Sequence, residues 1–149
     1  MRMTANWYNP GLMSRIITLD SVGKQRTHLT KAIVLCVREL ARQQEVGDEA
    51  RDLAAFVAVA LKAVADGIEA SVAAWEKRDY WIKADKFRME WDWAGPTSEK
   101  MRAAVLSDDW ATVATLSALI AQKLSKIQIS PNHRLGKPWV NAFKHLKAE

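Results

Sequence analysis

A chain of 149 residues with 49% hydrophobic and 26% charged residues has the length and composition of one ordinary globular domain. Its longest nearly uncharged run, residues 53–61, is far shorter than the roughly 20 apolar residues that cross a bilayer, so we expect no membrane span. Cys36 is the only cysteine, which excludes an internal disulfide and favours a reducing compartment. Because Arg15 interrupts the only apolar run near the N-terminus, we expect no signal peptide and a cytoplasmic location.

The net charge of +5 is distributed unevenly along the chain. Residues 1–47 carry seven basic against three acidic residues, residues 48–122 carry nine against thirteen, and residues 123–149 carry six against one. Basic ends around an acidic middle have two interpretations. Either the ends pack over the acidic helices or keep the domain soluble, or they form a surface that binds polyanions.

The N-terminal segment, residues 1–20, begins with Trp7 and Tyr8 and then carries the turn signal Asn9-Pro10-Gly11. Two adjacent aromatic rings would be exposed to water on a free tail, so we expect this segment to dock on the domain. Residues 13–19 stay open between helix, strand and coil. A helix or docked coil is favoured, because no second strand is predicted to pair with them.

A first helix is predicted from Asp20 or Ser21 to about Gln44, since apolar residues recur there at three- and four-residue spacing. These residues are Val22, Leu29, Ile33, Cys36, Val37 and Leu40. A short connection ending at Gly47 follows, and it predicts that the next helix returns antiparallel beside the first.

The stretch from Asp48 to Trp93 is the longest helix-forming run, with no proline and Gly67 as its only glycine. Asp48 is predicted to cap it, and its alanine-rich half carries one continuous apolar stripe that ends at Trp75. The stripe consists of Leu53, Val57, Ala60, Leu61, Val64, Ile68, Val72 and Trp75. The next stripe, through Tyr80, Ala84, Phe87 and Trp91, is out of phase with the first.

This slip near residues 76–79 indicates a bulge, a bend or a change of partner helix. The absence of glycine and proline at the slip favours one continuous helix, although the sequence leaves open whether residues 48–93 are one helix or two. A straight helix of that length would span on the order of 65–70 Å, more than a compact domain of this size, so it would bend or meet another subunit.

Further helices are predicted in the last third of the chain. Ala94-Gly95-Pro96 is expected to end the long helix, and Thr97 or Ser98 to cap the next one. The acidic turn at residues 107–109 predicts another cap, followed by a stripe of apolar residues. That stripe is formed by Trp110, Val113, Leu116 (or Ser117), Ile120 and Leu124, and it reaches Ile127. Pro138 suits the first position of a short last helix.

The fold class that follows is all-α. We expect a single domain, residues 1–149, forming an antiparallel bundle of about four to five helices organised on one long central helix. The docked segment 1–20 would precede the bundle, and the basic C-terminal segment 128–149 would follow it.

The sequence carries no pattern typical of a catalytic or metal site. His28, His133 and His145 lie far apart, and none is three or four residues from another histidine or from the cysteine. Cys36 lies on the apolar stripe of the first helix, which favours a small core residue over a nucleophile. We therefore expect no enzyme activity, no metal and no cofactor.

Residues 75–93 hold four of the seven tryptophans, interleaved with lysine and arginine. Trp81 and Trp93 fall off the second stripe, so aromatic rings occupy more than one face. Interfaces between proteins are enriched in such residues, which predicts partner contacts. The expected contact residues are Trp75, Trp81, Arg88, Trp91 and Trp93. Stacking of unpaired bases is a weaker interpretation, because nearby acidic residues repel phosphate, and a groove for a flat apolar ligand is a third.

The basic stretch of residues 123–147 is the better candidate for binding a polyanion, although a docked structural tail is the favoured interpretation. Its candidate residues are Lys123, Lys126, Arg134, Lys137 and Lys144. The leading hypothesis for the whole chain is a non-catalytic helical interaction module that self-associates or serves as a small subunit of a larger assembly. The alternative is an accessory nucleic-acid-binding protein that uses the basic N- and C-terminal segments. A small-ligand-binding bundle is the third.

Overall fold

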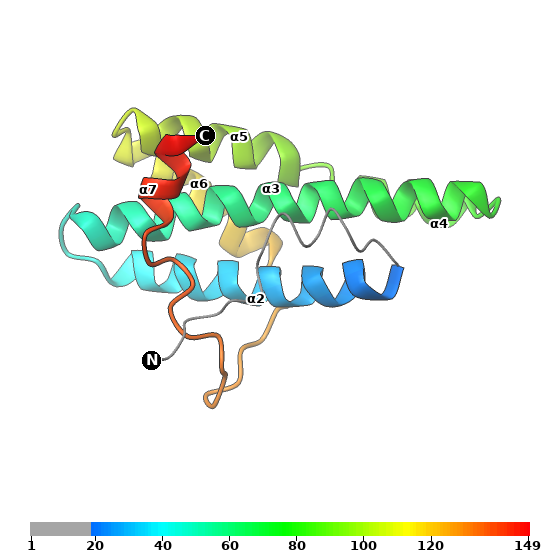
Figure 1. Ribbon diagram of the computed structural model, residues 1–149, viewed down its shortest axis with the longest axis horizontal. Helices are drawn as coiled ribbons and strands as arrows, with labels where there is room; N and C mark the ends of the chain where they lie inside the picture. The colour runs from blue at the N-terminus through cyan, green and yellow to red at the C-terminus, as the bar shows by residue number, and fades with distance from the viewer. Residues whose placement is uncertain (1–18) are drawn as a thin grey trace.

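A computed structural model of the protein describes residues 19–149, and within that range it contains six α-helices and no strand (Figure 1). The helices are α2 (Leu19–Arg42), α3 (Asp48–Lys77), α4 (Trp81–Trp91), α5 (Ala94–Leu106), α6 (Trp110–Lys123) and α7 (Ala142–Ala148). This confirms the all-α bundle organised on one long central helix. Trp7, Tyr8 and the rest of residues 1–18 lie outside the described residues. No described helix combines the length and apolar character needed to span a bilayer.

Helix α3 is the element on which the bundle is organised, since α2, α4, α5 and α7 all pack against it (Figure 1). Residues 53–58 are buried without interruption. Because they cover more than one full turn, protein surrounds this part of α3 on every side. Helix α2 packs tightly on α3 at Gly67, where a Cβ atom would lie 3.2 Å from Val22 Cγ1.

The favoured prediction of a continuous helix over residues 48–93 is wrong, because the chain reverses direction at residues 78–80. Asp79 adopts the left-handed conformation, with φ of 63°. Its N–H donates to the Glu76 carbonyl (3.0 Å), and the Tyr80 N–H donates to the Trp75 carbonyl (2.9 Å). These two bonds define a Schellman motif, which ends a helix by satisfying its last carbonyl groups. The reversal coincides with the slip in the apolar spacing.

Helix α4 therefore folds back along the C-terminal half of α3, and α5 continues the return (Figure 1). The prediction that this next helix is capped by Thr97 or Ser98 is also wrong, since α5 begins at Ala94. Pro96 is accommodated in the first turn, where backbone N–H groups have no partner within the helix. Thr97 and Ser98 are buried inside the helix.

Helix α6 begins directly after the predicted acidic turn. The Asp109 carboxylate accepts hydrogen bonds from the Thr112 hydroxyl (2.6 Å) and the Thr112 N–H (3.2 Å), and these bonds lower the pKa of Asp109. The last helix begins at Ala142, later than the predicted start at Pro138. The left-handed conformation of Asn141, with φ of 65°, separates the turn at residues 138–140 from the helix.

Replacing Asp79 by glycine is expected to raise the free energy of unfolding by up to about 1 kcal/mol, because an L residue is strained at positive φ. Urea denaturation of the purified variant measures this change. Asp79→Ala is the control, and we expect it to be destabilised by about 1 kcal/mol, since alanine lacks the local hydrogen bonds that help aspartate at such positions. Equal stability of the two variants would contradict the assignment.

Candidate functional site

The inner face of the α3–α4 hairpin is closed by aromatic contacts. The Trp75 and Phe87 rings meet edge to face, with centroids 4.8 Å apart and planes at 73°. The Lys83 ammonium lies 4.6 Å from the centre of the Trp75 ring. Ala84 is fully buried beneath them. Contacts of these kinds contribute about 0.5–1.5 kcal/mol each, so the hairpin is fixed as a unit.

Arg88 links the two helices of the hairpin. Its guanidinium donates to Glu76 Oε2 on α3 at 2.7 Å and to Asp85 Oδ1 on α4 at 2.8 Å. The hydrogen bond with Glu76 raises the pKa of Arg88, and the charges of Glu76 and Asp85 add to the effect. A guanidinium placed between two carboxylates of its own chain has little charge left to attract a phosphate.

Arg26 connects the hairpin to α2. Its guanidinium lies 4.8 Å from the centre of the Phe87 ring, and its Nη1 is buried without a hydrogen-bond partner. Burial lowers the pKa of Arg26, and the charge of Glu90 partly offsets this. The contact anchors α4 against the N-terminal part of α2.

The α3–α4 hairpin lies at one end of the molecule's long axis (Figure 1). Four large apolar side chains at the turn and on α4 are exposed. Tyr80, Trp81, Ile82 and Met89 are 53%, 54%, 76% and 70% exposed. We call these four residues the hairpin surface. Ile82 and Met89 are seven residues apart, so they share one face of α4 two turns apart. This end of the molecule thus carries four of the seven large apolar residues that the described part leaves exposed.

The tryptophans predicted as contact residues fall into two groups. Trp81 belongs to the hairpin surface, whereas Trp75, Trp91 and Trp93 are half-buried against the core. Trp91 and Trp93 stack with centroids 5.9 Å apart, and Trp93 Nε1 donates to the Glu90 carbonyl at 3.1 Å.

Sequence reasoning missed Tyr80, Ile82 and Met89. The seven-residue spacing of Ile82 and Met89 is a signal for a shared face, but it becomes informative only when a new helix is known to begin at Trp81. Within the long helix predicted for residues 48–93, neither residue belonged to an apolar stripe.

The five candidate cations for polyanion binding are exposed, and none forms an ion pair with another residue in the range 19–149. They are distributed over three different elements: Lys123 at the end of α6, Lys126, Arg134 and Lys137 on the connection that follows, and Lys144 on α7. Leu135, Trp139 and Leu146 from the same segment are buried.

Asp52 fixes the C-terminal segment to α3. Its two carboxylate oxygens accept the N–H of Asn141 (3.2 Å) and the N–H of Phe143 (3.0 Å), which lie about 90 positions further along the chain. Asp52 therefore serves as the N-terminal cap of α7 in place of a residue of α7 itself.

Replacing Asp52 by alanine is expected to lower the free energy of unfolding by about 1–2 kcal/mol, since helix caps and hydrogen bonds to charged groups contribute this much. It should also raise amide hydrogen exchange selectively in α7. Asp66→Ala is the matched control, because Asp66 also lies on α3 but pairs only with Lys62 (3.1 Å) on the exposed face. Unchanged exchange in α7 of Asp52→Ala would contradict the role of this cap.

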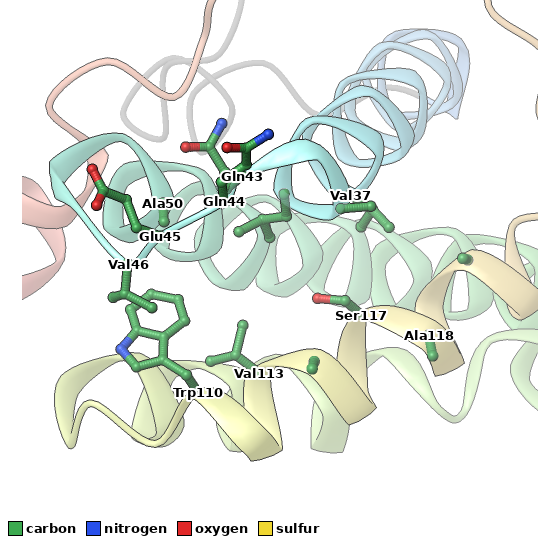
Figure 2. A pocket seen from close by; sticks show the side chains of 14 residues that line it. Val37, Gln43, Gln44, Glu45, Val46, Ala50, Trp110, Val113, Ser117 and Ala118 are labelled. Atoms are coloured by element: carbon green, nitrogen blue, oxygen red, sulfur yellow. The ribbon is translucent and has the colours of Figure 1, made fainter.

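A groove of about 480 Å³ lies between the C-terminal end of α2 and α6 (Figure 2). Its walls are mainly apolar and include Val37, Leu40, Val46, Trp110 and Val113. It is made by the end of α2, the connection to α3, the start of α3 and one side of α6. This groove is not the one predicted between tryptophan-bearing helices at residues 75–93. Trp110 is the only tryptophan that lines it.

Within residues 19–149 no group of three or more histidine, cysteine, aspartate or glutamate side chains is arranged to hold a metal ion. Cys36 is fully buried on α2. Burial raises the pKa of the Cys36 thiol well above its usual value, and the nearby charge of Glu39 adds to the effect. The thiol is therefore neutral at physiological pH.

Cys36 is expected to react with a disulfide reagent at pH 8 at least about a thousandfold more slowly in the native protein than in urea, since only opened molecules expose it. A raised pKa favours the folded state below the pKa of the unfolded thiol, and this contribution is lost as the pH rises further. Stability should thus fall more steeply above about pH 9 in the wild type than in Cys36→Ala. Rapid labelling of the native protein would contradict this burial.

Comparison with known protein families, with curated proteins and with solved structures finds no match to this chain. The residues and their geometry therefore carry the functional argument.

Proposed function

We propose that this protein is a non-catalytic helical interaction module that pairs with a second copy of itself through the hairpin surface. The observation that carries the proposal is the concentration of exposed apolar side chains at Tyr80, Trp81, Ile82 and Met89. A patch of this kind on the surface of a domain is typical of a protein-binding site. Tyrosine, tryptophan and methionine are also the residue types in which such interfaces are enriched.

The charges along α4 support pairing with a second copy in the antiparallel direction. Lys83 and Glu90 are seven residues apart and share one flank of the apolar face, while Asp85 and Arg88 lie on the other flank. With a two-fold axis between residues 86 and 87, each Lys83 would face Glu90 of the other copy, whereas Asp85 and Arg88 are already paired within each copy (2.8 Å). An isologous interface of this kind is the commonest route to a homodimer.

The length of α4 limits the strength of the pair. Eleven residues span about 16 Å, so the buried area falls at the small end of specific interfaces. We therefore expect a dissociation constant on the order of 1–100 µM.

Sedimentation equilibrium tests this proposal directly. The weight-average mass is expected to rise from the monomer mass of 16.8 kDa toward twice that value. This rise should occur between about 1 µM and about 500 µM protein, as expected for a small interface. A mass that stays at 16.8 kDa across this range would contradict the proposal.

The five candidate cations are exposed and form no ion pair within the described residues 19–149, which supports a second candidate, the accessory nucleic-acid-binding protein. Glu149 is the only acidic residue after residue 122, so little opposes the five candidate cations locally. If this candidate is right, single-stranded DNA binds with an affinity that falls with salt, by a slope of about −0.7 for each phosphate neutralised. Wild-type affinity in the combined Arg134→Ala and Lys137→Ala variant would count against it.

A further inference from the structure

The α2–α6 groove contains one buried polar group that nothing satisfies. Ser117 Oγ is buried and has no hydrogen-bond partner, a condition that it shares, among the described residues, only with Arg26 Nη1. Figure 2 shows the Ser117 hydroxyl directed from α6 into the space between α6 and α2. Buried hydroxyls in native proteins nearly always have a partner, so this one calls for an explanation.

Four other hydroxyls in the described helices donate to a carbonyl of their own helix. Thr27 donates to the Gly23 carbonyl (3.1 Å), Thr30 to Thr27 (3.1 Å), Ser98 to Gly95 (2.7 Å) and Thr115 to Ala111 (3.0 Å). This bond to the preceding turn is the usual solution for serine and threonine within a helix. Ser117 lies only two residues after Thr115 and does not make it.

We propose that the α2–α6 groove binds a neutral, mainly apolar small molecule that carries one oxygen acceptor for the Ser117 hydroxyl. A volume of about 480 Å³ is within the range of small-molecule sites, which are mostly apolar with a few placed polar groups. The Trp110 indole N–H is occupied by Asp108 Oδ1 at 2.6 Å, so its ring offers the groove an apolar surface. Because Ser117 Oγ is closed to solvent, a rotation about χ1 must turn the hydroxyl to the ligand, and Ser117 then supplies the one directional contact of the site.

The lining also argues for a neutral ligand. Glu45 is the only ionisable side chain among the residues that form the groove, and its carboxylate would repel an anion. Gln43 and Gln44 stand beside it and are uncharged. No residue of the hairpin surface lines the groove, so ligand binding and the proposed self-association can be tested independently of each other.

Benzophenone and diphenylmethane are matched probes, because they differ in the carbonyl oxygen that would accept the hydrogen bond. We expect benzophenone to bind the wild type about five- to tenfold more tightly than diphenylmethane does, which is the usual contribution of one hydrogen bond. In Ser117→Ala the two affinities should become nearly equal. Equilibrium dialysis measures all four values.

The position of the bound probe is tested separately. Benzophenone cross-links to nearby C–H bonds on irradiation, and peptide mass spectrometry should locate the adducts within residues 37–50 and 110–121. Ala118→Phe fills the groove and is expected to abolish cross-linking there, whereas Ala111→Phe makes the same change on a part of α6 that does not line it. Both alanines are exposed, so both variants should fold.

The inference would be overturned by any one of several results. These are the absence of benzophenone binding up to its solubility limit, an equal preference for the carbonyl in wild type and Ser117→Ala, and adducts outside the groove. Wild-type cross-linking in Ala118→Phe would overturn it as well.

Discussion

Truncating Leu61 to alanine is expected to lower the free energy of unfolding by about 3 kcal/mol, within the range observed for leucine removed from a packed core. Leu61 is fully buried near the middle of α3, the helix on which α2, α4, α5 and α7 pack. Rigid helices on several sides leave little freedom to collapse into the cavity. For a domain of this size the melting temperature should fall by roughly 6–12 °C.

The neighbouring residue provides a matched control. Lys62 lies on the exposed side of α3, and its ion pair with Asp66 (3.1 Å) is in solvent. Lys62→Ala should therefore change the free energy of unfolding by less than about 1 kcal/mol. Thermal and urea unfolding of both variants measures the difference. Similar losses in Leu61→Ala and Lys62→Ala would mean that α3 is not the centre of the core.

The alanine-rich half of α3 was predictable because periodicity records which residues are buried together. The stripe from Leu53 to Val72 is buried throughout. In the predicted α6 stripe Val113, Leu116 and Ile120 are buried, whereas Trp110 is only partly buried. This signal depends only on neighbours within one helix. It therefore remains valid even when the partner helices are unknown.

The helix boundary at Asp79 could not be predicted in the same way. Glycine normally marks a left-handed residue after a helix, and here aspartate occupies it. Aspartate also occupies the left-handed position after α5, at Asp108, with φ of 60°. There the Asp109 N–H donates to the Ala104 carbonyl at 2.9 Å. Aspartate is also a common first residue before a helix, so at residues 107–109 the sequence indicated the start of α6 but not the Schellman end of α5.

The candidate sites depend on contacts between distant parts of the chain. The groove joins residues 37–50 to residues 110–121, and Asp52 caps a helix about 90 positions away. No local pattern reports such contacts. The hairpin surface was located only in part, because the face that Ile82 shares with Met89 follows from the reversal at Asp79, which the sequence left open.

Replacing Ile82 by aspartate is expected to weaken self-association at least roughly 100-fold, because a two-fold interface loses the buried isoleucine twice, at about 1.5 kcal/mol or more each time. The aspartate also leaves a charge in the apolar centre of the pair. Sedimentation equilibrium should give a monomer at concentrations where the wild type is half dimeric. Circular dichroism should be unchanged, since Ile82 is 76% exposed in the single chain.

Val140→Asp is the control for a general effect of added charge. Val140 is 51% exposed on the C-terminal segment and lies outside the hairpin surface. We expect this variant to dimerise like the wild type. If it dissociates as readily as Ile82→Asp, the hairpin surface is not the interface.

A charge exchange distinguishes antiparallel pairing of two copies from every other arrangement. Lys83→Glu alone would face Glu90 of the other copy, and Glu90→Lys alone would face Lys83, so each should weaken the dimer by about three- to tenfold. The double variant restores both attractions in an antiparallel pair and should recover most of the affinity. In a parallel pair, or with an unrelated partner, the two losses would instead accumulate. Lys83 also contacts the Trp75 ring of its own chain, so the melting temperature of each variant must be measured as well. The double variant does not restore this contact. Recovery of dimerisation in that variant would therefore show that the charges act between the two copies.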